Sequence, residues 1–135
     1  MLVRSKAPFR ISFGGGGTDV PPYCWEYGGA VLNVAVNRYA YASLSLGGEK
    51  IVISSIDLTK ELEYAVSKLP YDGNLDLIKA VANYFNLDQG FRLETFSEMQ
   101  PGSGMGTSSS LAVSIIGAFS EALGLKMKKY DIAML

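Results

Sequence analysis

A glycine-rich segment that leads into a long apolar stretch is the part of this sequence best suited to chemistry. It runs Pro101-Gly102-Ser103-Gly104-Met105-Gly106-Thr107-Ser108-Ser109-Ser110. Glycine leaves no Cβ to keep an anion away from backbone N–H groups, and the start of a following helix adds unpaired N–H donors and a favourable dipole. The segment therefore predicts a phosphate-binding loop and a nucleotide ligand. It is not a Walker loop, because no lysine follows the last glycine.

Composition narrows the chemistry further. The chain has 135 residues, enough for one domain with a substantial core, and a net charge of −1, which argues against a nucleic-acid partner. It has no histidine, so carboxylates are the expected acid–base groups. Its single cysteine, Cys24, suits a reducing compartment. Because no apolar run approaches a membrane span or a signal peptide, we expect a cytoplasmic domain with no membrane partner.

A strand-rich first half is expected to position the loop. Residues 3–13 predict a strand that ends in the glycines of Gly14–Gly17, whose backbone can lie against a ligand. From residue 32 to 46, even-numbered positions are apolar except Arg38, a period of two that is typical of half-buried antiparallel sheet with a bulge or bend at Arg38. Further strands are expected at 50–55, 62–66 and 90–96, the last of which leads into the glycine-rich segment.

Two helices are predicted beside these strands. Asn74 is expected to cap the first, whose apolar stripe is formed by Ile78, Val81, Ala82 and Phe85. The second, about 108–123, is apolar nearly all round and should stop at Gly124. We expect it to be the most buried element, with three core residues: Leu111, Ile115 and Phe119. The predicted class is α+β, a mixed, mostly antiparallel sheet covered on one face by helices.

Two motifs resemble those of one enzyme family. Pro101 to Ser110 is similar to the phosphate-binding motif PxxxGLGSSAA of the GHMP kinases, with Met105 in place of leucine and Thr107 in place of a serine. Ala7 to Phe13, followed by Gly15, Thr18 and Asp19, is similar to their N-terminal motif, PGRVNLIGEHTDY in galactokinases. The resemblance covers essentially the whole chain. Within the family, the glycine-rich variants most resemble bacterial D-glycero-D-manno-heptose 7-phosphate kinases and related fucokinase domains.

The resemblance implies an ATP-dependent sugar kinase with the fold of ribosomal protein S5 domain 2, and with ATP and Mg²⁺ as cofactors. It implies that Arg10 is catalytic, close to the transferred phosphate and the acceptor hydroxyl, and that the Ser108 hydroxyl reaches Mg²⁺. It also assigns ATP binding to a continuous run of residues: Pro101, Gly102, Ser103, Gly104, Met105, Gly106, Thr107, Ser108 and Ser109. The alternative for Arg10 is a surface arginine at a strand end.

The acceptor side of the site is expected at Gly16, Gly17, Thr18 and Asp19. Galactokinases carry a Glu-His pair where this chain has Gly16 and Gly17, so a larger or more negative substrate is implied, since a run of N–H donors suits an anion. A heptose phosphate fits that description. The alternatives are a mobile glycine loop without a ligand and an aspartate that only caps a turn.

The family comparison also predicts missing parts. GHMP kinases continue for roughly as many residues again, with a catalytic aspartate and a second domain, so residues 1–135 are expected to be a truncated N-terminal ATP-binding domain that is inactive alone. A second polypeptide or a second copy of the chain is the expected cover for its C-terminal end. Three functions stay open: a heptose 7-phosphate kinase acting on the anomeric hydroxyl, a kinase for galactose, fucose or a mevalonate-like alcohol, and a non-catalytic nucleotide-binding module.

Overall fold

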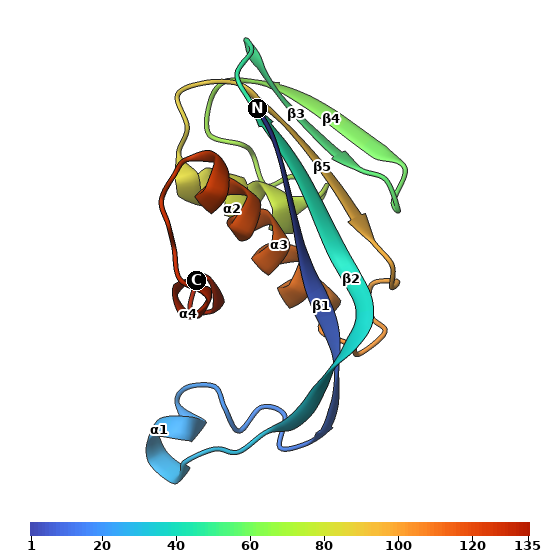
Figure 1. Cartoon of the computed structure of the whole chain (residues 1–135), viewed down its shortest axis with the longest axis vertical. Coiled ribbons are helices and arrows are strands. Elements are labelled where there is room, and N and C mark those ends of the chain that lie inside the picture. Colours follow the sequence, from blue (N-terminus) through green and yellow to red (C-terminus); the bar gives the residue numbers. More distant parts are fainter.

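A computed structural model describes all of residues 1–135. Five strands and four helices follow one another along the chain (Figure 1). In chain order they are β1 (Leu2–Gly14), α1 (Tyr23–Tyr27), β2 (Leu32–Leu46), β3 (Lys50–Ser55), β4 (Lys60–Ala65), α2 (Asp76–Phe85), β5 (Phe91–Ser97), α3 (Thr107–Ala122) and α4 (Lys129–Ala133). The predicted strands are therefore present with shifts of a few residues, the largest in β4. None of the four helices has the length and hydropathy of a membrane span.

The strands form one sheet in the order β1-β2-β5-β3-β4. Three of the four neighbouring pairs are antiparallel, and only β3 and β5 are parallel. The parallel pair requires a crossover connection, which α2 supplies together with β4. The predicted α+β class with a mixed, mostly antiparallel sheet is confirmed.

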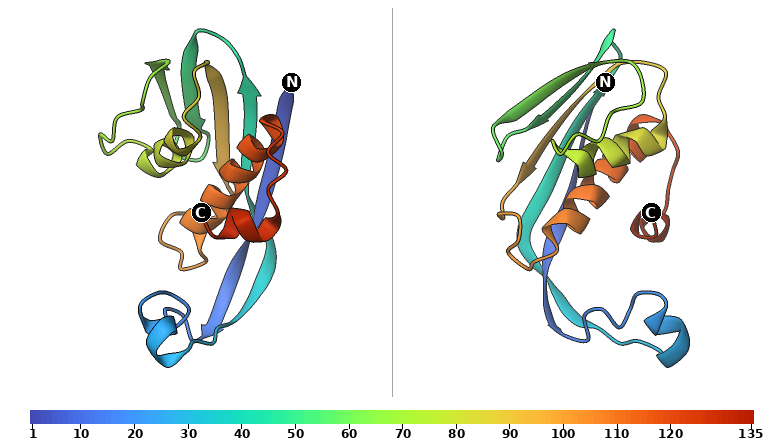
Figure 2. Two further views of the ribbon diagram at one scale, coloured as in Figure 1. Left: turned by 90° about the vertical axis from the view of Figure 1, so that its left-hand side faces the viewer. Right: turned by 180° about the vertical axis from the view of Figure 1, so that it is seen from behind.

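The helices α2 and α3 lie on the same face of this sheet (Figures 1 and 2). The core lies between that face and α3, where Ile115 and Phe119 are completely buried, while Leu111 is half-buried against the same cluster. The Phe119 ring stacks on Phe85 with 4.7 Å between centroids and meets Phe91 edge-on at 5.4 Å. One aromatic side chain of α3 thus joins α2 to the sheet.

The helix α3 stops where the sequence predicted. The Gly124 N–H donates to the Glu121 carbonyl at 3.1 Å and the Leu125 N–H donates to the Ser120 carbonyl at 2.9 Å. These two bonds form the Schellman arrangement that satisfies the last carbonyls of a helix. The chain then turns away to α4, which packs on α3.

The predicted cap of α2 is wrong. The residue before the helix is Leu75, at φ +54°, and Asn74 provides no cap. The Asn74 side-chain oxygen instead accepts a hydrogen bond from Lys60 Nζ at 3.1 Å. Asp76, inside the first turn, accepts from the Gly73 N–H at 2.9 Å and pairs with Lys79, so its carboxylate bonds to the segment before the helix and not to the helix N–H groups. No side chain therefore caps α2.

The long strand β2 is exposed in its first half and buried on one face in its second half. Its alternation holds from Ala40 to Leu44, where even positions are buried, but Leu32 and Val34 are exposed. Between these halves the register against β1 shifts, because Pro8 pairs with Tyr39 while Arg10 pairs with Ala35. The bulge predicted at Arg38 is confirmed. Beyond it, β1 and β2 continue as a two-stranded ribbon past the end of α3 and carry α1 at its far end (Figures 1 and 2).

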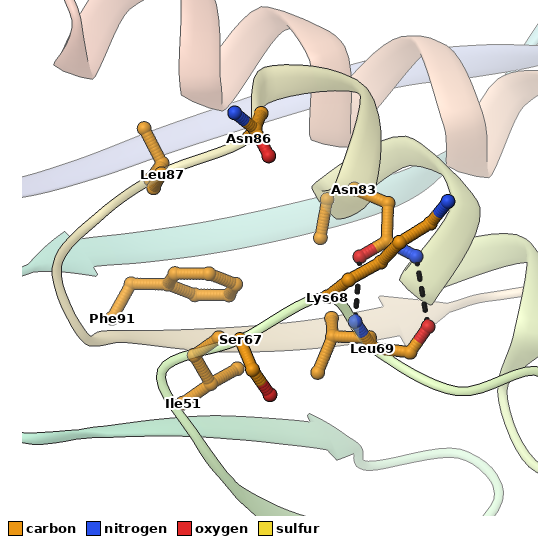
Figure 3. A pocket seen from close by; sticks show the side chains of 9 residues that line it. Ile51, Ser67, Lys68, Leu69, Asn83, Asn86, Leu87 and Phe91 are labelled. Carbon is orange, nitrogen blue, oxygen red and sulfur yellow. Dashed lines mark hydrogen bonds between the residues drawn. The ribbon is translucent and has the colours of Figure 1, made fainter.

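The segment between β4 and α2 is tied to the second half of α2. The Asn83 side-chain oxygen accepts from the Leu69 N–H at 2.8 Å, and its amide donates to the Leu69 carbonyl at 2.9 Å (Figure 3). These two bonds satisfy both backbone polar groups of Leu69. A cavity of about 100 Å³ lies beside it, lined by Ile51 and Phe91 among others. Because this cavity lies away from the glycine-rich segment, we assign the Asn83 contacts to structure.

Replacing Phe119 with alanine should destabilise the chain strongly. The ring joins three elements and is completely buried, so the expected loss of unfolding free energy is about 3–5 kcal/mol. The matched control is Phe13→Ala, at a ring that is 67% exposed, for which we expect a change within about 0.5 kcal/mol. Urea unfolding measures both. Equal losses in the two variants would contradict the core described here.

Candidate active site

The glycine-rich segment forms an open loop before an uncapped helix. Gly102, Gly104 and Gly106 have φ values of +83°, +72° and +69°. Gly106 precedes α3, and no side chain caps the helix. The first intrahelical bond runs from the Ser110 N–H to the Gly106 carbonyl at 2.9 Å. The N–H groups of residues 107–109 therefore have no partner within the helix and remain available to an anion.

The loop also has room for an anion. A Cβ added at Gly102 or Gly104 would meet no atom within 4 Å, so both positions face open space. Ser108 and Ser109 are exposed beside this space, and Met105 is half-buried beneath the loop. The donors, the open space and the helix start together fit a phosphate group.

Arg10 of β1 lies directly against this loop. Its backbone N–H donates to the Met105 carbonyl at 3.2 Å. Its guanidinium lies where a side chain on Gly106 would be, since Nη1 is only 2.7 Å from the position of a Cβ there. The Ser110 hydroxyl donates to the Pro8 carbonyl at 2.9 Å and fixes the first turn of α3 to the same strand. Residues nearly a hundred positions apart thus bring a positive charge to the glycine-rich loop.

A pocket of about 260 Å³ adjoins the loop. One wall comes from the glycine-rich segment and α3, including Pro101, Thr107, Ser108 and Leu111. The facing wall comes from the turn after β3 and the start of α2, and includes Asp57, Leu58, Gly73, Leu75 and Asp76. The sequence did not predict this wall. No motif marks these residues, because only the packing of α2 beside α3 brings them to the loop. The available signal was two aspartates, at residues 72 and 76, followed by a lysine at residue 79.

That lysine, Lys79, is completely buried on α2. Its Nζ lies 2.6 Å from Asp72 Oδ1 and 3.0 Å from Asp76 Oδ1, and 5.7 Å from the centre of the Tyr64 ring. Burial alone would lower the pKa of Lys79, but the hydrogen bonds to the two carboxylates outweigh it and raise that pKa above its usual value. The same hydrogen bonds from Lys79 lower the pKa of both Asp72 and Asp76. All three groups are therefore charged near neutral pH.

The residues expected to contact the acceptor lie elsewhere, on the arm formed by residues 11–34. Thr18 uses its hydroxyl on the backbone: it donates to the Gly15 carbonyl at 2.7 Å and accepts from the Ala30 N–H at 3.1 Å. Gly16, Gly17 and Asp19 are exposed. The helix α1 packs against none of the other helices or strands. The structure thus joins Arg10 to the phosphate loop but holds Thr18 and Asp19 apart from both.

The chain offers few ligands for a metal ion. No group of three or more histidine, cysteine, aspartate or glutamate side chains is placed to hold one. Ser108 lines the pocket beside the loop, where its hydroxyl is exposed. A Mg²⁺ ion usually keeps several waters and is bound by one or two protein groups plus substrate phosphates. The residues present therefore fit an ion that arrives with a nucleotide.

In the loop of the arm, Gly15 lies close against the backbone of Ala30. A Cβ at Gly15 would lie 1.8 Å from the Ala30 carbonyl oxygen, whereas one at Gly17 would meet nothing within 4 Å. Both residues have positive φ, +77° and +88°, so alanine is strained at both and only Gly15→Ala adds a clash. We expect Gly15→Ala to speed amide hydrogen exchange at Thr18 and Ala30, and Gly17→Ala to leave those two amides unchanged. Similar exchange in both variants would contradict this arrangement.

Known proteins match both the loop and the whole fold. Residues 75–135 match the family model described as GHMP kinases N terminal domain. Over 98% of this chain, the sequence is 38% identical to a D-glycero-alpha-D-manno-heptose 7-phosphate kinase of Campylobacter jejuni, of which the chain spans 41%. It is 28% identical to an L-fucokinase/L-fucose-1-P guanylyltransferase of Bacteroides fragilis, of which it spans 17%. The chain thus covers less than half of the length of these relatives, which are phosphotransferases by name.

A solved structure agrees with the sequence match. The crystal structure of a D-glycero-D-manno-heptose 1-phosphate kinase from Bacteroides thetaiotaomicron superposes with a TM-score of 0.89 at 37% identity and covers 98% of this chain and 45% of its own. A mevalonate kinase structure at 19% identity shares the fold with a TM-score of 0.76. The family model thus places residues 75–135 among the GHMP kinase N-terminal domains, and the superpositions show that the whole chain has the fold of these two kinases.

Proposed function

We propose that this chain is the ATP-binding part of a sugar kinase that phosphorylates the anomeric hydroxyl of D-glycero-D-manno-heptose 7-phosphate. The observation that carries the proposal is the contact between Arg10 and Gly106, which puts a cation against an open loop of unpaired N–H groups. The heptose phosphate as acceptor rests on the 38% identity to the Campylobacter enzyme. The other kinase relatives leave fucose as the alternative to be tested.

In this proposal the loop from Pro101 to Ser109 holds the β- and γ-phosphates of ATP. The N–H groups of residues 107–109 point their unpaired donors at the anion, and the dipole of α3 adds to the attraction. The adjoining pocket of about 260 Å³ receives the ribose and base. Ser108 stands between the loop and the pocket, so its hydroxyl is placed to reach a Mg²⁺ ion bound to the phosphates. Such an ion neutralises charge on the phosphate oxygens.

Arg10 has the catalytic role. Phosphoryl transfer depends on positioning and on neutralising charge that spreads over the equatorial oxygens of the transferred group. The backbone bond from Arg10 to Met105 fixes the main chain from which the side chain extends, and the guanidinium already lies beside Gly106, close to where the phosphate would bind. Its planar fork of donors suits phosphate oxygens better than a lysine would.

The arm supplies the acceptor site. The exposed N–H groups of Gly16 and Gly17 suit an anionic substituent of the sugar, and the Asp19 carboxylate suits its hydroxyls. Thr18 closes the loop that presents them. Because the arm lies apart from the phosphate loop, the acceptor must bridge the two or the arm must move. We therefore propose that the isolated chain binds nucleotide and does not turn over substrate.

Gly104→Asp should abolish nucleotide binding by the purified chain, because a carboxylate would occupy the space meant for phosphate. The matched control is Gly104→Asn, which has the same shape and the same strain at φ +72° but no charge. Calorimetric titration with ATP measures both variants, with circular dichroism to verify folding. We expect no detectable binding for Gly104→Asp and partial binding for Gly104→Asn. Unchanged ATP affinity in Gly104→Asp would remove the loop from the proposed site.

The acceptor is tested in a chimera in which this chain replaces the matched part of the Campylobacter kinase. We expect ATP-dependent phosphorylation of the heptose 7-phosphate in preference to fucose, galactose and mevalonate. Arg10→Ala should lower kcat by about 10²-fold or more, the usual cost of removing one group that stabilises transition-state charge. The control is Arg4→Ala, an exposed arginine on the same strand. A folded chimera that prefers another acceptor would refute the heptose assignment, and an unchanged kcat in Arg10→Ala would refute the role of Arg10.

A further inference from the structure

The burial of Lys79 has no explanation in packing alone. It lies in the first turns of α2 between the core residues Ile78 and Ala82, and its side chain is completely buried. Lysine is almost never fully buried unless it is paired, and an ion pair inside a protein is often no more stabilising than apolar residues of the same volume. An apolar residue here would serve the core as well. We therefore expect the charge of Lys79 to have a role other than stabilising the core.

Its partners show what the charge holds in place. Asp76 accepts hydrogen bonds from the N–H groups of Asp72 at 3.2 Å and Gly73 at 2.9 Å, in addition to its contact with Lys79. Asp72 likewise accepts from the Asn74 N–H at 2.9 Å. Each carboxylate thus binds both the ammonium group and the backbone of the segment 72–76. These contacts hold Leu75 at φ +54°, a conformation that a leucine keeps only where its surroundings impose it.

This segment is one wall of the pocket beside the phosphate loop. Gly73, Leu75 and Asp76 line the pocket from the side opposite Ser108 and Leu111. Lys79 and Asp72 do not line it. The glycine-rich loop is held by other contacts, those with Arg10 and Pro8 of β1. The buried cation can therefore affect the pocket wall without affecting the phosphate cradle.

We propose that Lys79 is a positioning residue for the nucleoside part of the nucleotide: through Asp72 and Asp76 it fixes the segment 72–76 against which the base and ribose pack. The inference rests on the proposed function, because it takes the pocket to be the place of the base and ribose. It assigns to the ion pair an effect on nucleoside recognition and none on triphosphate recognition. Two ligands that share a triphosphate and differ in the nucleoside distinguish these effects.

The test compares ATP with inorganic tripolyphosphate on the purified 135-residue chain. Lys79→Met keeps the length of the side chain and removes its charge, so the carboxylates lose their shared partner. We expect the dissociation constant for ATP to rise about tenfold, within the usual range for coupling between two sites, and that for tripolyphosphate to change by less than about twofold. The matched control is Lys68→Met, an exposed lysine on the segment before α2, which should change neither value.

A second variant covers the case in which Lys79→Met does not fold. Asp72→Asn alters a side chain that is 42% exposed and absent from the pocket lining, so the fold should survive while the grip on the segment weakens. We expect the same selective loss of ATP affinity, smaller in size. Equal affinities for ATP in a folded variant and the wild type would overturn the inference, as would equal losses for ATP and tripolyphosphate. If the wild-type chain binds neither ligand, the proposed function itself fails.

Discussion

The contact between β1 and the start of α3 is the constraint on which the candidate site depends. The backbone of Arg10 bonds to Met105, and the Ser110 hydroxyl bonds to the Pro8 carbonyl. The absence of a side chain at Gly106 leaves the space that the Arg10 guanidinium occupies. Because α3 is also the most deeply buried helix and its first turn bonds to β1, its N-terminus is anchored to the sheet. The unpaired donors of the loop therefore face a fixed position in space, which is what electrostatic stabilisation of a phosphate requires.

The two walls of the pocket beside this loop are stabilised by different kinds of interaction. The wall from α3 is fixed by apolar packing, with Ile115 and Phe119 anchored in the core. The facing wall is a short segment with little apolar side chain to bury, and it depends on Lys79 and its two carboxylates. Hydrogen bonds to charged groups are directional and stronger than neutral ones. Such hydrogen bonds can fix the conformation of a turn that has too few apolar contacts to fix it by packing.

The arm contrasts with both walls. Its ribbon continues past the helices, and the aromatic side chains Phe13 and Trp25 are 67% and 79% exposed. Its internal geometry is nevertheless well defined, because Thr18 bridges Gly15 and Ala30 and leaves no space for a side chain at Gly15. The loop is therefore shaped locally, while its position relative to the phosphate cradle rests on the β1–β2 ribbon alone. This difference explains why Arg10 and the glycine-rich loop lie together in the structure while the arm residues proposed for the acceptor lie apart from them.

The sequence by itself determined the elements and the position of the glycine-rich loop. Period-two alternation predicted β2 and its bulge at Arg38, and the glycines and hydroxyls from Gly102 to Ser109 predicted an anion site before a buried helix. These features depend on neighbouring residues, so local patterns suffice to predict them. The family motifs added Arg10 and the residues of the arm as candidates, and their roles stay predictions.

Only the tertiary structure decided which distant groups meet. The position of the Arg10 guanidinium against Gly106, the pocket wall from Gly73 to Asp76 and the burial of Lys79 all depend on how α2 and α3 pack on one sheet. The wrong prediction of a cap at Asn74 has the same origin, because the Asn74 side chain bonds to Lys60 of β4 and not to the first turn of α2. In the sequence, Lys79 next to the apolar stripe of α2 resembles a solvent-facing residue. Its burial becomes evident only when Asp72 and Asp76 are placed beside it in space. Long-range pairing is set by packing geometry, which no local pattern in the sequence records.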